Sequence, residues 1–559
     1  MRRAYVCVAV VVACVVAQAP VMGVREPVRL RQAMVIAQQP ADDAGVEVLR
    51  KGGNAIDAAI AVGFALNAAY PYAGALGGGG FMLIRLANGQ TSFIDFRERA
   101  PAASTRTMYL DPQGNLTRDS IEGWRSSGVP GTVRGFELAH KRFGRLAWKD
   151  DVAPAIALAS KGFTASYAFA EQLRGSRSLA RDPESTRLWL KGGAFYEPGE
   201  RIVLPELAET LTRIATNGPN EFYTGRTATT LAAEMKAHGG LVTMADLAEY
   251  AAVERTPLTG QYRNYTIIAS PPPSSGGVGL LQMLGMLEGT GYEKSGYGSA
   301  ASMHYMAEVM RRFYADRNEY LGDPDFVKNP LSGLLDKGYL ARRRASIDLT
   351  KATPSASLGA GLTAGEKAET THYNVVDAEG NAVAVTYTLN GGFGNGITVP
   401  GLGFLLNNEM DDFTSKPGAA NLFGLVQGEA NTIVPGKRPL SSMAPTIVLK
   451  DGQLHMLLGG PGGSRIPTAV LQVFLNVVDF GMNPQEAVDA PRFHHQWLPD
   501  AIGVERGFSP DALALLRQRG HEVRQDTGPV SAVVELLVKD GGWLHGAADA
   551  RRSGRASGY

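Results

Sequence analysis

The stretch from residue 369 to residue 390 constrains the fold of this chain more than any other part of it. Polar, small and β-branched side chains alternate on both sides of Ala378-Glu379-Gly380, a pattern that predicts two strands joined by a three-residue loop. Gly380 stands where such a loop needs a left-handed residue. A fold about Glu379 places Thr370 opposite Thr388, unless a bulge shifts the register by one residue.

One face of the second strand should carry Thr386, Thr388 and Asn390, because side chains alternate along a strand. Strands are rich in β-branched residues, so cross-strand packing alone explains Thr370 and Thr371. A threonine inside a chain becomes a good nucleophile only when the chain is cut before it and the new α-amine acts as its base. The hairpin alone does not decide whether Thr370 serves strand packing or acts as a nucleophile.

Length and composition indicate a large globular chain without a polyanionic partner. The 559 residues exceed a typical single domain, yet no linker composition divides them. The net charge of +1 gives no electrostatic reason to expect nucleic acid or an acidic membrane surface. Apolar residues make up 44% of the chain, which is enough for a sizeable core.

Hydrophobic periodicity places the expected helices and strands. It predicts helices at 41–49, 55–68, 131–143, 152–161, 204–216, 229–238, 278–287, 303–320 and 467–480. Apolar runs predict further strands at 34–37, 81–85, 446–449 and 453–458. Strands flanked by helices on both sides predict a layered α/β sandwich. Residues 346–368 show no strong period and are rich in small and polar residues, so we expect them to be mobile.

The N-terminus resembles an export signal. Arg2-Arg3 precedes the apolar run from Ala4 to Val16, and Ala17-Gln18-Ala19 resembles a signal-peptidase site. We therefore expect residues 1–19 to be a signal peptide and the mature protein to be periplasmic or secreted. The run is too short to span a bilayer comfortably, so we expect no transmembrane anchor in the mature chain.

The cysteines fit export, because Cys7 and Cys14 are the only two and both lie in this segment. The mature chain would then hold neither a disulfide nor a reactive thiol. A lipoprotein cleavage box at Val11-Val12-Ala13-Cys14, with Cys14 carrying the lipid, is the lesser alternative.

Further along the chain, ordered motifs resemble the γ-glutamyltranspeptidase family. These are Thr370–Asp377, Leu405–Phe413, Lys437–Thr446, Gly460–Arg465 and Pro491–Trp497, together with Asp95–Ala100. The resemblance implies the four-layer αββα sandwich of the N-terminal nucleophile hydrolases. It also implies a precursor that cuts itself between Glu369 and Thr370. A large subunit of residues 20–369 would then stay bound to a small subunit of residues 370–559.

The resemblance assigns the chemistry to the hairpin and one glycine pair. Thr370 would be the nucleophile, its α-amine the general base, and Thr388 the residue that hydrogen-bonds it. Gly462 and Gly463 would form an oxyanion hole, since glycine lets backbone N–H groups approach a developing negative charge. The alternative for the glycines is a turn that merely opens the next helix.

A γ-glutamyl donor ends in an ammonium and a carboxylate, and the family's motifs supply partners for both. Asn390, Glu409 and Asp412 match the ammonium side, whereas Arg97, Ser441 and Ser442 match the carboxylate side. Without the family motifs, a surface ion pair would explain Arg97, and a solvated acidic turn or a metal site would explain Asp412. No suitably spaced His or Cys accompanies Asp412, so we expect no metal and no cofactor.

Two further features complete the expectations. Pro417 to Gly428 matches a lid loop in which many bacterial members place Tyr where this chain has Phe423, so the hydroxyl latch to Asn390 should be missing. His494 and His495 invite a general-base or metal interpretation, but the family does not use them in that way. We expect them to be structural.

The sequence therefore favours a secreted γ-glutamyl transferase and hydrolase of glutathione and related small molecules. The acyl group would pass to water, amino acids or peptides. A cephalosporin or glutaryl acylase is the second hypothesis, and poly-γ-glutamate cleavage is a third, which a covered pocket disfavours. An uncleaved binding protein without activity is the non-enzyme alternative.

Overall fold

A computed structural model describes residues 25–74, 76–358, 370–422, 424–525 and 530–559. The expected signal peptide, both cysteines, Glu369 and Phe423 lie outside these described residues. Within them, no helix is both long and apolar enough to cross a membrane.

Two antiparallel sheets of seven strands each form the centre of the molecule. The first sheet has the order β19 (Gly554–Gly558), β2 (Met34–Gln38), β10 (Thr371–Val376), β11 (Ala382–Thr388), β3 (Gly79–Arg85), β4 (Thr91–Phe96) and β7 (Val253–Arg255). The second has the order β1 (Val28–Leu30), β18 (Trp543–Ala547), β17 (Glu535–Asp540), β13 (Gln453–Gly459), β12 (Thr446–Lys450), β9 (Tyr265–Ala269) and β8 (Leu258–Tyr262).

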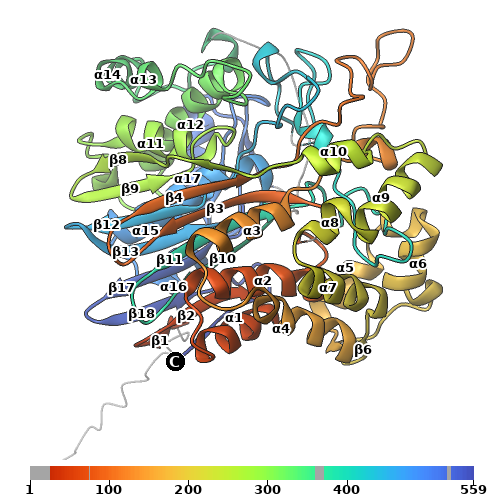
Figure 1. The fold of residues 1–559 in the computed structure, drawn as a ribbon. Helices are drawn as coiled ribbons and strands as arrows, with labels where there is room; N and C mark the ends of the chain where they lie inside the picture. The colour runs from red at the N-terminus through yellow and green to blue at the C-terminus, as the bar shows by residue number, and fades with distance from the viewer. Residues whose placement is uncertain (1–24, 75, 359–369, 423, 526–529) are drawn as a thin grey trace, which may run out of the picture.

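Helices cover the outer face of each sheet, and the sheets pack face to face between them (Figure 1). The first sheet is covered by α1 (Ala41–Arg50), α2 (Ala55–Ala69) and α3 (Thr132–Phe143), and α4 (Trp148–Lys161) packs on α1 and α2. The second is covered by α11 (Gly276–Leu287), α15 (Ile466–Val478) and α16 (Pro484–Asp489), and α12 (Ala300–Tyr320) packs on α11. This confirms the predicted αββα sandwich.

The remaining helices lie around these layers. They are α5 (Tyr167–Arg174), α6 (Pro183–Trp189), α7 (Pro205–Asn217), α8 (Asn220–Thr224), α9 (Arg226–Ala237), α10 (Met244–Glu249), α13 (Leu331–Leu334), α14 (Lys337–Ala345) and α17 (Pro510–Gln518). Short strands β5 (Phe163–Thr164) and β6 (Arg201–Ile202) pair with each other, and β14 (Phe493–His494), β15 (Ile502–Val504) and β16 (Val523–Arg524) form a small third sheet.

Alternation along the central strands separates the two cores. On β10, Tyr373 and Val375 belong to the apolar core beneath α2, whereas Val376 belongs to the core that includes the second sheet. Both faces of β10 are fully buried, because one lies under helices and the other under a sheet. The even-numbered face carries His372, which hydrogen-bonds Thr386 on the neighbouring strand at 2.7 Å. Thr370 directly precedes this strand.

The hairpin has the register that the sequence predicts. Thr371 pairs with Tyr387, and Val376 pairs with Ala382 at the other end. The loop closes with a hydrogen bond from the Asp377 N–H to the Asn381 carbonyl at 3.1 Å. Gly380 has a φ of +92°, the conformation for which the loop needs glycine. The ladder contains no bulge, so the two threonines come to the same end of the hairpin.

The prediction that Asn390 continues the strand face of Thr386 is wrong in one respect. Strand β11 ends at Thr388, and Asn390 has a φ of +75°. The chain therefore turns sharply after Thr388, which an asparagine tolerates better than most residues. The turn re-aims the side chain of Asn390 instead of extending the strand.

The expectation of mobility in the segment 346–368 is not met in its described part, residues 346–358. Ile347, Ala352 and Ser355 are at most 9% exposed. The arginines of α12 hold the segment, with Arg312 hydrogen-bonded to the Ser346 carbonyl at 2.8 Å. These contacts come from distant residues, so the missing periodicity did not reveal them.

Candidate active site

One pocket opens at the end of the hairpin where Thr370 and Thr388 lie, and its empty volume is about 290 Å³. Nine of the ten predicted site residues line it, namely Arg97, Thr370, Thr388, Asn390, Glu409, Asp412, Ser441, Ser442 and Gly463. The sequence analysis missed the other lining residues, which are Arg317, Leu425, Met443, Ser464 and Ile466. The lining combines segments that are far apart in the chain.

Thr370 stands immediately before β10 and is 4% exposed. Its carbonyl lies 3.5 Å from the Arg552 guanidinium. The Thr388 hydroxyl accepts a hydrogen bond from the Asn390 N–H at 2.8 Å. The predicted bond between the Thr370 and Thr388 hydroxyls is not among those that join the described residues, although both side chains line the pocket.

The glycine pair follows β13 in a tight turn. Gly462 has a φ of +143° and Gly463 a φ of +56°, so both require glycine-like freedom. Within the described residues, neither of their N–H groups donates a hydrogen bond. Gly463 lines the pocket directly, whereas Gly462 packs behind it against Ala532. The Gly463 N–H, on a residue that lines the same pocket as Thr370, has no acceptor among the described residues and would suit a developing oxyanion.

Arg97 follows the end of β4 and is fully buried among carboxylates. Its guanidinium forms ion pairs with Asp412 and, at 2.5 Å, with Glu409. Glu98 lies 3.7 Å away on the same guanidinium, and the Arg97 Nε donates to the Pro439 carbonyl at 3.3 Å. The alternative that Arg97 belongs to a surface ion pair is therefore wrong, since all of these groups are buried.

Burial dominates the ionisation of this acidic cluster. It raises the pKa of Glu98 to about 8 and the pKa of Glu409 well above its ordinary value, in each case against the attraction of Arg97. Burial also raises the pKa of Asp412. The attraction of one arginine thus does not offset the burial of three carboxylates, and a further cation bound beside them would favour their ionised forms.

Backbone pairing with the loop after β9 positions the serines. The Ser441 N–H donates to the Pro273 carbonyl at 2.8 Å, and the Ser275 hydroxyl donates to the Ser441 carbonyl at 2.8 Å. The Ser441 hydroxyl accepts from the Met443 N–H at 3.1 Å. The loop that contains Pro271, Pro272 and Pro273 is thus packed against the segment of Ser441. Both serines line the pocket.

The described residues of 417–428, the segment predicted to be a lid loop, contact the pocket through Leu425. Asp411 accepts the Leu422 N–H at 2.7 Å, and Gln496 donates to the Gly424 carbonyl at 3.2 Å. Leu425 lines the pocket from this loop. Since Phe423 lies outside the described residues, the missing latch to Asn390 stays a prediction. Asn390 donates its side-chain amide to the Asn408 carbonyl at 2.9 Å.

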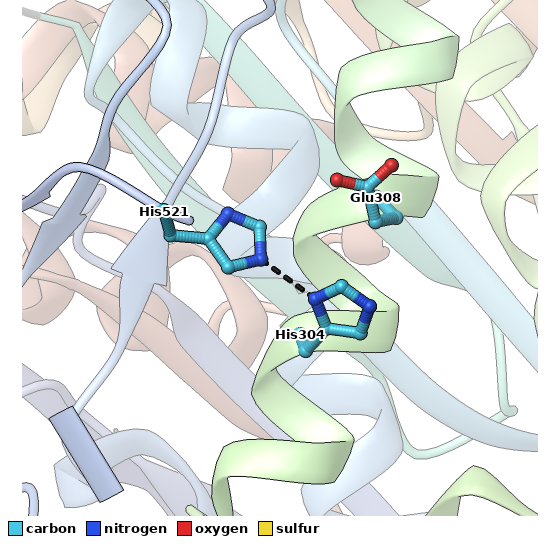
Figure 2. A group of neighbouring side chains, drawn as sticks. All are labelled: His304, Glu308 and His521. Atoms are coloured by element: carbon cyan, nitrogen blue, oxygen red, sulfur yellow. Dashed lines mark hydrogen bonds between the residues drawn. The ribbon is translucent and has the colours of Figure 1, made fainter. Parts of the chain in front are cut away.

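The described residues hold two groups of side chains with metal-ligating atoms, both outside the pocket. In the first, His304 and Glu308 of α12 face His521 (Figure 2). The His304 Nδ1 lies 2.7 Å from the His521 Nε2, and the His304 Nε2 lies 2.7 Å from the Asp348 carbonyl. A carbonyl only accepts, so the proton sits on the His304 Nε2 and His521 donates to His304.

Glu308 is engaged elsewhere, which disfavours a metal in this group. Its carboxylate pairs with Arg312 at 2.7 Å and Arg311 at 3.2 Å. A divalent cation here would lie beside two guanidinium groups. The second group is Asp57, His140 and Asp151, where Asp57 already accepts backbone N–H groups of Asn54 and Arg145. The expectation that no metal is needed stays a prediction.

His494 and His495 are buried away from the pocket lining. His494 bonds to Thr468 at 2.8 Å and Gln496 at 2.9 Å, and its pKa is lowered to about 3 by burial. His495 lies 3.3 Å from Asp500, and burial lowers its pKa to about 4. Neutral, internally paired histidines fit the structural role that we expect for them.

An αββα sandwich with a buried threonine at the start of a central strand, free N–H donors and a charged pocket defines an N-terminal nucleophile hydrolase. The comparisons agree on a narrower class. A family model described as gamma-glutamyltranspeptidase matches residues 41–559. The chain therefore belongs to the γ-glutamyltranspeptidase family.

Individual relatives cover nearly the whole chain. The glutathione hydrolase proenzyme of Escherichia coli strain K12 is 51% identical, covering 94% of this chain and 91% of the relative. An acylase, the ACY 1 proenzyme of Pseudomonas sp. strain SE83, is 39% identical, covering 95% and 94%. Among solved structures, the cephalosporin acylase from Bacillus halodurans has a TM-score of 0.83 at 26% identity, covering 97% of this chain and 98% of that chain.

Proposed function

We propose that this chain cleaves the γ-glutamyl amide of glutathione and related small molecules through a γ-glutamyl ester on Thr370. One observation carries the proposal. A single pocket brings the Thr370 side chain together with buried groups of both charges, as a zwitterionic γ-glutamyl end requires. Membership of the γ-glutamyltranspeptidase family and the 51% identity to a glutathione hydrolase support the same assignment.

The mature nucleophile requires a cut between Glu369 and Thr370. In this step the Thr370 Oγ attacks the Glu369 carbonyl carbon, the peptide C–N bond breaks, and water hydrolyses the resulting ester. The cut frees the Thr370 α-amine and leaves a large subunit of residues 20–369 with a small subunit of residues 370–559. The proenzyme name of the relative supports this processing, and the expected signal peptide would direct the product to the periplasm or beyond.

In turnover, the Thr370 Oγ attacks the donor's γ-carbonyl carbon while its proton passes to the α-amine. The N–H groups of Gly462 and Gly463 stabilise the oxyanion. The C–N bond then breaks, and the leaving amine takes the proton from the α-ammonium. Water, or the amine of an amino acid or peptide, attacks the ester in the same way and releases the γ-glutamyl group. Thr388 positions the nucleophile through the hairpin.

Donor recognition divides between the two sides of the pocket. Glu409, Asp412 and the Asn390 side chain receive the α-ammonium, whose charge the acidic cluster attracts. Arg97, Ser441 and Ser442 receive the α-carboxylate. The Arg97 ion pairs with Glu409 and Asp412 are then shared with, or exchanged for, contacts to the donor.

A glutaryl or cephalosporin acylase is the second candidate, because acylases match the whole chain. A glutaryl group has the same carboxylate but no α-amine. Such a donor would bring a carboxylate but no cation to a site where Glu409 and Asp412 already share Arg97 as their ion-pair partner, and additional unpaired negative charge is costly when buried. The identity to the acylase, 39%, is also lower than the 51% to the glutathione hydrolase.

The discriminating experiment compares the purified protein on glutathione and on a glutaryl amide of the same leaving group. We expect kcat/KM for the γ-glutamyl donor to exceed that for the glutaryl donor by at least about 100-fold, the loss typical of an unpaired charged group. Equal rates would contradict the zwitterion pocket, and a faster glutaryl reaction would establish the acylase.

A further inference from the structure

Arg317 is a pocket residue to which the sequence analysis assigned no role. It lies near the end of α12, is 1% exposed and lines the same pocket as Thr370. Helix α12 otherwise packs in the layer over the second sheet (Figure 1). Arg317 thus brings a full positive charge from the helix layer to the substrate pocket.

Every hydrogen-bond partner of Arg317 in the described chain is uncharged. Its Nε donates to the Ser275 hydroxyl at 2.9 Å and its Nη2 to the Ser442 hydroxyl at 3.1 Å. Its Nη1 contacts the side-chain carbonyl oxygens of Asn318 at 3.0 Å and Gln427 at 3.4 Å. Among the described residues no carboxylate forms an ion pair with it, although Asp412 attracts its charge from farther away. Burial accordingly lowers its pKa to about 10.

The second arginine of the pocket has the opposite environment. Arg97 contacts Glu409 and Asp412 directly, with Glu98 at 3.7 Å. The pocket therefore holds one arginine in direct ion pairs with carboxylates and a second, Arg317, which Asp412 attracts only from beyond ion-pair distance. Because buried charges in proteins are usually paired directly, this difference indicates that a direct counter-ion for Arg317 comes from outside the chain.

The hydrogen bonds also fix the direction in which Ser442 can donate. The Ser442 oxygen accepts from Arg317, so its own O–H remains available to a pocket ligand. Arg317 acts on the neighbouring serine too, because it donates to Ser275, whose hydroxyl donates to the Ser441 carbonyl at 2.8 Å. A ligand at this wall therefore meets hydroxyl donors backed by a positive charge, which suits a carboxylate.

We infer that Arg317 is a specificity-determining and positioning residue, which orients the Ser442 hydroxyl and supplies the positive charge that the donor's α-carboxylate neutralises. This inference rests on the proposed function, because it concerns the same donor. The alternative is that Arg317 has a purely structural role and only joins α12 to Gln427 and Ser442. Loss of a structural residue would slow the reaction of every donor equally, whereas loss of a carboxylate partner would slow only the reaction of donors that carry the carboxylate.

The test uses two donors with the same leaving group, γ-glutamyl-p-nitroanilide and 4-aminobutyryl-p-nitroanilide. The second lacks only the α-carboxylate. For Arg317→Met we expect KM for the γ-glutamyl donor to rise at least about 30-fold, as for loss of a buried charged partner. The rate on the 4-aminobutyryl donor should stay within about 3-fold of wild type, which is ordinary background variation. Arg317→Lys should show a smaller but equally selective loss.

Arg312→Lys is the matched control, because Arg312 is a buried arginine of the same helix that contacts Glu308 and not the pocket. It should change both donors alike. Equal losses on both donors in Arg317→Met, or in Arg317→Lys if the methionine variant does not fold, would overturn the inference while leaving the proposed function intact. A wild-type protein inactive on the γ-glutamyl donor would instead overturn the proposed function and the inference with it.

Discussion

The Arg97 guanidinium forms an ion pair with the Asp412 carboxylate inside the pocket, and both side chains are buried. The pair joins residues on the two sides of the expected zwitterion site. It keeps each charge satisfied before a donor binds, which buried charges require. Donor binding must therefore replace or share this contact, and the consequences are measurable.

Replacing Asp412 by Asn should selectively weaken the binding of γ-glutamyl donors. The substitution removes the negative charge that receives the α-ammonium, at a cost of about 2 kcal/mol or roughly 30-fold in KM. A glutaryl donor has no ammonium and should lose much less. Steady-state kinetics on both donors checks this. Asp323→Asn, a buried aspartate outside the pocket lining, is the control. An equal loss on both donors would count against the ammonium assignment.

Gly462→Ala should lower kcat about 100-fold with little change in KM, the effect of losing an oxyanion donor. A Cβ at this position would lie 2.6 Å from the Ala532 Cβ, and the φ of +143° strains any side chain. The turn must therefore shift and carry its N–H groups away from the oxyanion. Gly452→Ala, at a φ of +75° but with open space around it, controls for backbone strain alone. Unchanged kcat in Gly462→Ala would refute the oxyanion role.

Asp411 should make the lid sensitive to pH. Burial raises its pKa to about 6, while the Leu422 N–H and the Ser120 hydroxyl bond to the ionised form. Because this pKa is higher than that of an exposed carboxyl, the closed form binds the proton first, and acidification through pH 6 favours it. We expect proteolysis within 417–428 to slow about fivefold from pH 7 to pH 5.

In Asp411→Asn the cleavage rate should respond little to pH, because an amide does not titrate. The protease must be one whose own activity is constant across this range. A variant whose cleavage slows on acidification as much as that of wild type would show that Asp411 is not the group responsible.

His372 should make the fold less stable in acid. It is fully buried between the sheets, and burial lowers its pKa to about 3 from an ordinary 6.5. The unfolded chain thus binds a proton first as the pH falls, so stability is full above pH 6.5 and declines below it. At pH 5 the loss is about 2 kcal/mol.

Thermal unfolding of wild type and His372→Gln across pH 5–7.5 measures the loss of stability that His372 causes in acid. The difference between their stabilities should shrink or reverse toward pH 5. His238→Gln, whose side chain is 52% exposed, is the control. If the stabilities of wild type and His372→Gln fell in parallel with pH, His372 would not be the source of the acid sensitivity.

Local pattern predicted much of this fold because the relevant contacts are close in sequence. The three-residue loop at Gly380 determines the β10–β11 register, so the juxtaposition of Thr370 and Thr388 could be derived before the structure was known. Predicted helices such as 41–49 and 55–68 agree with α1 and α2 within one residue at each end. Periodicity is strong there because each helix buries one face or all of its surface.

The rest depended on long-range packing. Nothing near Arg317 in the sequence shows that it faces Ser442, which lies more than a hundred positions later. The turn at Asn390 and the packing of residues 346–358 on α12 likewise arise from contacts between distant segments. The family motifs located the other pocket residues, whereas a buried arginine on a long helix has no local pattern that marks its partner.

The cut between Glu369 and Thr370 tests the central claim most directly, because the α-amine of Thr370 exists only after it. Intact-mass analysis and N-terminal sequencing of the purified wild type should give two chains, the smaller one beginning at Thr370. Thr370→Ala should remain one chain with no γ-glutamyl hydrolase activity. A wild-type protein that stays uncut yet hydrolyses a γ-glutamyl donor, or a Thr370→Ala variant cut and active like wild type, would contradict the account.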